Sequence, residues 1–254
     1  MNAIRTVLAA GVVALLVSPA QAAGGGAQAP EHRWSHSGLF GTFDRAALLR
    51  GAQVYKEVCS ACHGLRLVAY RNLMEIGFSE NAVKAIAAEK EVPAEPNDEG
   101  EVEMRPAIPA DKFVSPFPNE NAARAANGGA YPPDLSLIVK ARPGGADYIH
   151  ALLTGYKEEP PAGVTVPDGM NYNEYFAGNM IAMAPPLYED GIQFADGTKA
   201  TVEQMSEDVT VFLAWAAEPE LEERKRMGIK VILFLLVLTG LLYVVKRRIW
   251  ADVH

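Results

Sequence analysis

The stretch "VYKEVCSACHGL" at residues 54–65 contains both cysteines of the 254-residue chain. Cys59 and Cys62 are three positions apart, and His63 follows the second cysteine directly. Three kinds of site can use this spacing: a redox-active dithiol, half of a structural zinc site, or the attachment point of a c-type haem. The residues around the motif help to distinguish these alternatives.

The residues before the cysteines predict a helix that leads into the motif. Asp44 is a favourable N-cap for the segment RAALLRGAQVYKEV at residues 45–58. Apolar positions recur at helical spacing and form one stripe, which comprises Leu48, Ala52, Tyr55, Cys59 and Cys62. Because positions three and four apart share a helix face, both thiols and the His63 imidazole would point to the same side. Gly64 suits the end of such a helix.

The two alternatives to haem explain less of the sequence. A thioredoxin-like dithiol expects a preceding strand in a β-α-β arrangement, which the pattern lacks. A structural zinc ion needs four ligands as a rule, and the chain has no second cysteine pair. The remaining histidines are scattered along the sequence, at His32, His36, His150 and His254. The motif therefore favours one covalent haem c, with His63 as an iron ligand.

A second iron ligand would distinguish an electron carrier from a haem with an open site, because a methionine thioether raises the haem potential. Five methionines are poor candidates. Met1 lies in the leader, and Met227 lies at the membrane. Met74 follows the haem helix closely, Met104 lies in an acidic segment, and Met205 lies in an amphipathic helix predicted at 201–218. The candidates that remain are Met170, Met180 and Met183. Met183 has the best setting, because two prolines follow closely and hold an extended backbone. A core-filling role for any of the three remains open at this point.

The two ends of the chain predict export and membrane anchoring. Residues 1–22 have a short basic start, an apolar stretch and small residues at the end, as in a cleaved signal peptide. Residues 226–245 are long enough to span a bilayer and carry no charge from Val231 onward. The basic residues that follow predict a cytoplasmic tail at 246–254. For a bacterial source, residues 23–223 would be a periplasmic head held in the inner membrane by one helix.

The head is strongly acidic. Residues 23–223 contain 15 basic and 30 acidic side chains, a formal charge of −15. Such a surface repels nucleic acid and favours cationic partners. Residues 89–111 are acidic, rich in proline and without apolar periodicity, which predicts an exposed and partly mobile insertion.

Longer stretches of the sequence resemble the cytochrome c1 family, the haem subunits of the ubiquinol–cytochrome c reductase complex, in its alphaproteobacterial form. The most specific stretch is AARAANGGAYPPDLSLIVKARPGGADYIHALLTGY at residues 122–156. Further matches are WSHSGLFGTFDRAALLRGAQVYKEVCSACHGL, YFAGNMIAMAPPLYEDG, DVTVFLAWAAEPELEERKRMG and the C-terminal anchor. Together they cover nearly all of the chain after the leader.

The resemblance implies a set of haem contacts. It implies covalent haem c at Cys59 and Cys62, and His63 and Met183 as the axial ligands. It implies that Arg142 and Tyr148 contact a haem propionate, where a guanidinium would compensate a partly buried carboxylate. Residues that match pocket-lining positions of the family are Asn127, Ala130 and Pro133. Some bacterial relatives also carry a disulfide near the methionine loop, and this chain has no spare cysteine for one.

The resemblance also implies the fold and the function. We expect a mainly α, cytochrome c-type haem domain with long loops, followed by one C-terminal transmembrane helix. The chain would receive electrons from a Rieske iron–sulfur protein and pass them to a soluble cytochrome c. Cytochrome b would share the membrane, lipid would surround the anchor, and the whole complex would be a dimer.

Two other functions are open on the motifs alone. One is a different membrane-anchored cytochrome with a single haem, such as an oxidase subunit. The other is a haem enzyme with an open iron site, such as a peroxidase, although multihaem peroxidases need a second C-x-x-C-H motif, which this sequence lacks.

Overall fold

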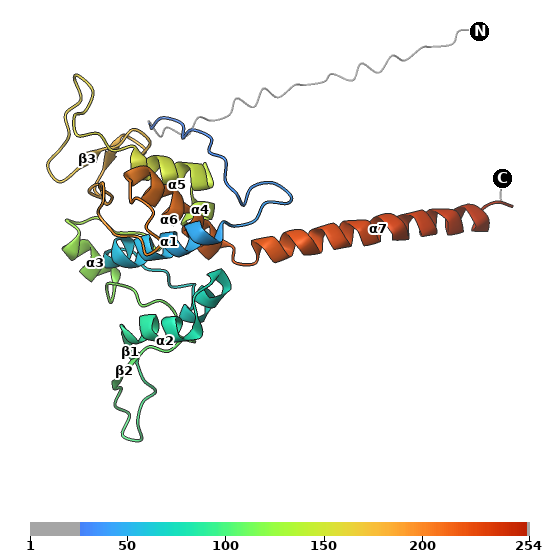
Figure 1. Cartoon of the computed structure of the whole chain (residues 1–254), viewed down its shortest axis with the longest axis horizontal. Helices are drawn as coiled ribbons and strands as arrows, with labels where there is room; N and C mark the ends of the chain where they lie inside the picture. Colours follow the sequence, from blue (N-terminus) through green and yellow to red (C-terminus); the bar gives the residue numbers. More distant parts are fainter. Residues whose placement is uncertain (1–25, 253–254) are drawn as a thin grey trace, which may run out of the picture.

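Helices dominate residues 26–252, the part of the chain that this computed structural model describes (Figure 1). The α-helices are α1 (Arg45–Glu57), α2 (Glu80–Ala88), α3 (Glu120–Ala126), α4 (Ile138–Ala141), α5 (Gly145–Thr154), α6 (Val202–Ala217) and α7 (Leu221–Ile249). Two 3₁₀ helices, η1 (Cys59–Ala61) and η2 (Tyr70–Ile76), and four short strands, β1 (Glu91–Pro93), β2 (Met104–Pro106), β3 (Asn171–Tyr172) and β4 (Met180–Ile181), complete the elements. The predicted mainly α fold is confirmed, whereas the predicted leader at 1–22 lies outside the described residues.

Helix α1 begins where the sequence predicts and ends earlier. The Asp44 carboxylate accepts hydrogen bonds from the backbone N–H groups of Ala46 and Ala47, at 2.8 and 3.2 Å, which caps the helix. The α-helix ends at Glu57, and the cysteines lie on the 3₁₀ turn that follows and just beyond it. The prediction that one continuous α-helix carries the whole motif is therefore wrong.

Gly64 does not end a helix, contrary to the prediction. A Cβ atom at this position would lie 3.0 Å from the Ser115 Oγ atom and 3.1 Å from the Asp134 Oδ2 atom. The missing side chain therefore allows two loops that are distant in sequence to pack directly against the motif.

The core is built around the crossing of α1 and α6. Gly51 lies at the contact, where an added Cβ atom would be only 2.0 Å from the Asp208 carbonyl oxygen. Large side chains around this point have almost no solvent exposure, among them Leu48, Val54, Phe212 and Trp215. Helix α5 packs against α6 on another side, so α6 is the centre of the head.

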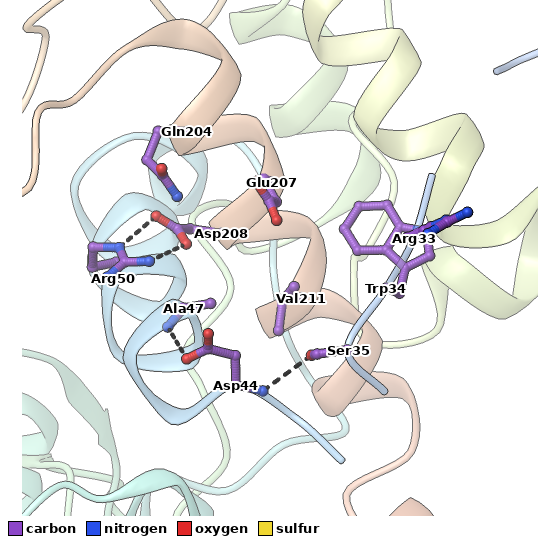
Figure 2. A pocket seen from close by; sticks show the side chains of 10 residues that line it. All are labelled: Arg33, Trp34, Ser35, Asp44, Ala47, Arg50, Gln204, Glu207, Asp208 and Val211. Atoms are coloured by element: carbon purple, nitrogen blue, oxygen red, sulfur yellow. Dashed lines mark hydrogen bonds and ion pairs between the residues drawn. The ribbon is translucent and has the colours of Figure 1, made fainter. Parts of the chain in front are cut away.

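A buried ion pair also joins α1 to α6. The Arg50 guanidinium donates two hydrogen bonds to the Asp208 carboxylate, with N–O distances of 2.7 and 2.9 Å (Figure 2). Asp208 is fully buried, and a carboxylate in that position needs a paired charge. Removing one partner of such a pair costs about 3–5 kcal/mol, because the other charge stays buried.

The acidic insertion at 89–111 is exposed, as predicted, but it has defined structure. Strands β1 and β2 pair antiparallel within it, and the hairpin projects from the head (Figure 1). The Arg105 guanidinium donates to both carboxylate oxygens of Asp111, at 2.7 and 3.0 Å. The sequence shows no strand periodicity here, because each strand has only three residues.

Helix α7 leaves the head as a single long rod (Figure 1). Its most apolar 18-residue window has a mean hydropathy of 2.5, and none of that window is buried against the rest of the described chain. Its 29 residues correspond to roughly 44 Å, more than the hydrocarbon core of a bilayer requires. The helix anchors the chain in a membrane.

The α1–α6 crossing yields a prediction about stability. Gly51→Ala should lower the free energy of unfolding of the head by about 1–3 kcal/mol, because the new methyl group must push the two helices apart. Thermal or denaturant unfolding of the detergent-solubilised chain measures this change. Gly228→Ala is the matched control, because an added Cβ in that helical position meets no atom within 4 Å. An equal effect of the two substitutions would contradict the close crossing.

Candidate haem site

The imidazole of His63 is held by the backbone of a loop from another part of the chain. Its Nδ1 atom lies 2.7 Å from the carbonyl oxygen of Pro133. Because a carbonyl can only accept, Nδ1 carries the proton and donates it, which leaves the Nε2 lone pair available for a metal. Burial also lowers the pKa of His63, against the opposing effect of this hydrogen bond, and so favours the neutral imidazole that a metal requires.

The loop that supplies Pro133 is itself fixed to the motif. The backbone N–H of Leu135 donates to the Gly64 carbonyl at 2.9 Å, and the backbone N–H of Arg66 donates to the Asp134 carboxylate at 2.9 Å. On the other side, the Tyr55 hydroxyl donates to the His63 carbonyl at 3.0 Å. Hydrogen bonds therefore hold the motif between α1 and residues 133–135.

The two thiols are available for bonding. Cys59 and Cys62 form no disulfide; Cys59 is half-buried and Cys62 is exposed. Burial raises the pKa of the Cys59 thiol to about 12, whereas redox-active C-x-x-C motifs depend on a lowered thiol pKa. The motif also follows helix α1 rather than the strand that a thioredoxin-like dithiol expects, so the dithiol alternative is disfavoured.

The zinc alternative also finds no support. Although they are far apart in the sequence, His32 and His150 stack with ring centroids 5.0 Å apart, beside Trp34. Nevertheless, no group of three or more His, Cys, Asp or Glu side chains within the described residues is arranged to hold a metal ion.

The structure places the methionines set aside on sequence, but it leaves Met170, Met180 and Met183 all half-buried and so does not choose between them. Met205 is buried inside α6, where it fills the core, and Met74 and Met104 are exposed. Met180 lies within strand β4, and Met183 is half-buried in the loop that follows. The Met183 carbonyl accepts a hydrogen bond from the Tyr156 hydroxyl at 3.1 Å, and it lies 3.4 Å from the amide nitrogen of Asn171.

Asn173 holds the β3–β4 hairpin that precedes Met183, although nothing in the sequence singles it out. It is fully buried, and its side chain donates to the Leu152 carbonyl at 2.8 Å. The same side chain accepts from the backbone N–H groups of Tyr175 and Phe176, at 3.0 and 3.1 Å. One asparagine thus ties the loop after β3 to the end of α5. Such internal hydrogen bonds can hold the methionine loop without a disulfide.

The residues expected at a propionate lie close to one another. Arg142 is exposed after α4, and none of the ion pairs found among residues 26–252 includes it. Burial raises the pKa of Tyr148, and the nearby charge of Arg142 opposes this rise. Burial raises the pKa of Tyr156, and the nearby Tyr148 adds to this rise.

The three pocket positions lie in the segment that follows α3. Asn127 uses its side-chain amide to donate to the Ala123 carbonyl at 2.7 Å, so it terminates α3. The backbone N–H of Ala130 donates to the Asn127 carbonyl at 3.0 Å. The Pro133 carbonyl accepts the hydrogen bond from His63 Nδ1.

Residues 34–253 match the model of the Cytochrome C1 family. The chain belongs to this family. It is 50% identical to cytochrome c1 of Rhodospirillum rubrum, over 98% of this chain and 97% of that protein. It is 52% identical to the cytochrome b-c1 complex catalytic subunit of Candida albicans, over 90% of this chain and 79% of that protein. It is 49% identical to cytochrome b/c1 of Bradyrhizobium diazoefficiens, over 92% of this chain and 37% of that longer protein.

The residues present fit the covalent haem c that membership of the cytochrome c1 family implies. The donor atoms match those that such a haem needs. Two thiols without a disulfide lie beside an imidazole whose Nδ1 is hydrogen-bonded, so its Nε2 can bind a metal. A thioether on a loop held by hydrogen bonds is the remaining donor that a haem of this type uses.

The methionine hairpin yields a prediction. Asn173→Ala should lower the free energy of unfolding by about 3 kcal/mol, because three backbone groups lose their buried partner. Asn171→Ala removes only one long contact and should cost less than about 1 kcal/mol. Thermal unfolding of the purified chain compares the two variants, and equal stabilities would contradict the role of Asn173.

Proposed function

We propose that this chain is the cytochrome c1 subunit of a membrane-bound quinol–cytochrome c oxidoreductase. The names of two relatives support this assembly, since one is a cytochrome b-c1 complex subunit and another joins cytochrome b with c1. In this proposal the chain accepts electrons from a Rieske iron–sulfur protein and delivers them to a soluble cytochrome c, with cytochrome b in the same membrane and a dimeric complex. The observation that carries the proposal is the Nδ1–carbonyl hydrogen bond of His63 beside two free thiols, in a chain of this family.

The chain's own residues would bind and orient the haem. Cys59 and Cys62 would form thioether links to its vinyl groups, and His63 Nε2 and the Met183 sulfur would be the axial ligands. When bound, the haem supplies a one-electron iron(III)/iron(II) couple. The chain makes and breaks no bond in a substrate, so it acts as an electron carrier within the enzyme complex.

The fixed positions of both donors suit rapid electron transfer. The Pro133 carbonyl holds the His63 ring and increases its basicity as a ligand. On the other side, the Tyr156 hydroxyl restrains the backbone of Met183. Donors that are restrained before the electron arrives need little rearrangement when the charge changes.

Arg142 and Tyr148 would receive a propionate group. Arg142 is exposed and is not committed to any ion pair found within residues 26–252, and a guanidinium can bind a carboxylate through two parallel hydrogen bonds. The haem pocket would also be lined by Asn127, Ala130 and Pro133. The cation would also favour the reduced haem, which carries less positive charge.

The orientation in the membrane follows from the charges at the ends of α7. Lys246, Arg247 and Arg248 lie in its last turn and favour the cytoplasmic side. In a bacterium the head would therefore lie in the periplasm, with residues 1–22 as the export signal and 246–254 as the cytoplasmic tail.

Substitution of the proposed axial methionine tests the function. Met183→Leu should lower the midpoint potential of the haem by more than about 100 mV while the haem stays covalently attached, since axial ligands tune haem potentials over roughly 0.8 V. Met180→Leu is the matched control, three residues away on strand β4, and should leave the potential nearly unchanged. Redox titration of the purified complex measures both, and an unchanged potential in Met183→Leu would exclude it as the ligand.

The acidic head yields a second prediction. The association rate with a basic soluble cytochrome c should fall at least about tenfold between low and high ionic strength, because the formal charge of −15 steers a cationic partner. Stopped-flow mixing at several salt concentrations measures the rate. A rate independent of salt would rule out electrostatic steering.

A further inference from the structure

Residues 35–42 form a tight loop, here called the 35–42 loop, that exposes two large apolar side chains. The backbone N–H of Thr42 donates to the Ser35 carbonyl at 3.1 Å and closes the loop. Its path needs glycine at position 41, where a Cβ atom would lie 1.9 Å from the Ser37 carbonyl oxygen. The loop is therefore a specifically shaped projection rather than an irregular connection.

The tip of this loop is apolar and faces away from the protein. Phe40 is 80% exposed and Leu39 is 58% exposed, although both are large hydrophobic residues. The neighbouring Phe43 and Trp34 are buried in the core, so the chain buries apolar side chains on both sides of the loop and leaves these two outside. Adjacent exposed apolar groups of this size indicate a contact surface.

The base of the loop is attached to the first turns of α7. The Lys225 ammonium group donates to the carbonyl oxygens of His36 and Gly41, at 2.6 and 3.1 Å, so it bridges the two arms of the loop. The Glu222 carboxylate accepts from the backbone N–H of Phe43 at 2.8 Å. These bonds fix the position of the loop relative to the membrane helix.

This attachment places the base of the loop just above the headgroup layer of the membrane, within reach of the loop tip. The apolar run of α7 begins at Val231, six residues or about 9 Å along the axis from Lys225. The headgroup layer on each side of a bilayer is roughly 5–8 Å thick. In Figure 1 the segment before α1 projects from the head on the side from which α7 leaves.

We propose that Leu39 and Phe40 insert into the headgroup region of the lipid bilayer, as a second membrane contact beside α7. The contact is apolar in character, because both inserted side chains are hydrocarbon. Of the nearby cations, Lys225 binds the loop carbonyls, Arg45 pairs with Glu222, and Arg224 pairs with Glu218. Arg33 and Arg226 are exposed and take part in no ion pair found among residues 26–252, so they can meet lipid headgroups beside the loop. With the rigid link to α7, the inserted loop would fix the orientation of the head above the membrane. The inference rests on α7 spanning the membrane and does not depend on the haem ligands.

The test is a spin label placed at the loop tip. A nitroxide is attached to Phe40→Cys, and separately to Leu39→Cys, in the whole complex in nanodiscs of phosphatidylcholine and phosphatidylglycerol. Both original side chains point outward, so the substitutions should leave the fold intact. Val102→Cys is the matched control, because Val102 is 54% exposed on the loop of the β1–β2 hairpin. Collisions with oxygen, which concentrates in lipid, are compared with collisions with a water-soluble nickel chelate.

The labelled sites should differ clearly. The ratio of oxygen to nickel accessibility should be several-fold higher at positions 39 and 40 than at position 102. A ratio equal to that of Val102→Cys would overturn the proposal, since the loop would then lie in water. An immobile label shielded from both reagents would also overturn it, because the loop would then contact a protein subunit. The complex without an added cysteine supplies the background and shows separately whether Cys59 and Cys62 are blocked by haem.

Discussion

The hydrogen bond from His63 Nδ1 to the Pro133 carbonyl is the constraint on which the site depends. It sets the tautomer of the imidazole and directs Nε2 as a potential metal ligand. It also joins two segments that are 70 positions apart in the sequence, so the motif acquires its geometry only when residues 133–135 have folded against it. The thiols, by contrast, are supplied by the motif alone.

The rest of the head positions the two sides of the proposed haem site through different elements. The histidine side depends on α1, whose Gly51 and Arg50 fix it closely against α6. The methionine side depends on the β3–β4 hairpin, where Asn173 replaces a covalent restraint with several internal hydrogen bonds. The two sides meet through α5, which contains Tyr148 and packs on α6. Both sides therefore rest on the same core of α5 and α6.

Local signals predicted much of the fold. The Asp44 cap, the amphipathic pattern of α6 and the apolar run of α7 each depend on neighbours in the sequence, and the structure agrees with them. The end of α1 at Glu57 was not predicted, because a single 3₁₀ turn commonly follows the last turn of an α-helix and no glycine or proline marks the change here. The role of Pro133 could not be found either, since any residue offers a backbone carbonyl. Asn173 resembles an ordinary turn residue in sequence, and only its burial distinguishes it.

The central claim is that Cys59 and Cys62 hold a haem covalently beside His63. Extraction of the purified complex with acidified acetone, followed by separation of its subunits, tests it most directly. The account predicts that the haem stays with this polypeptide, and that its pyridine haemochrome spectrum is that of a haem with both vinyl groups saturated. Release of all the pigment into the acetone would contradict the account.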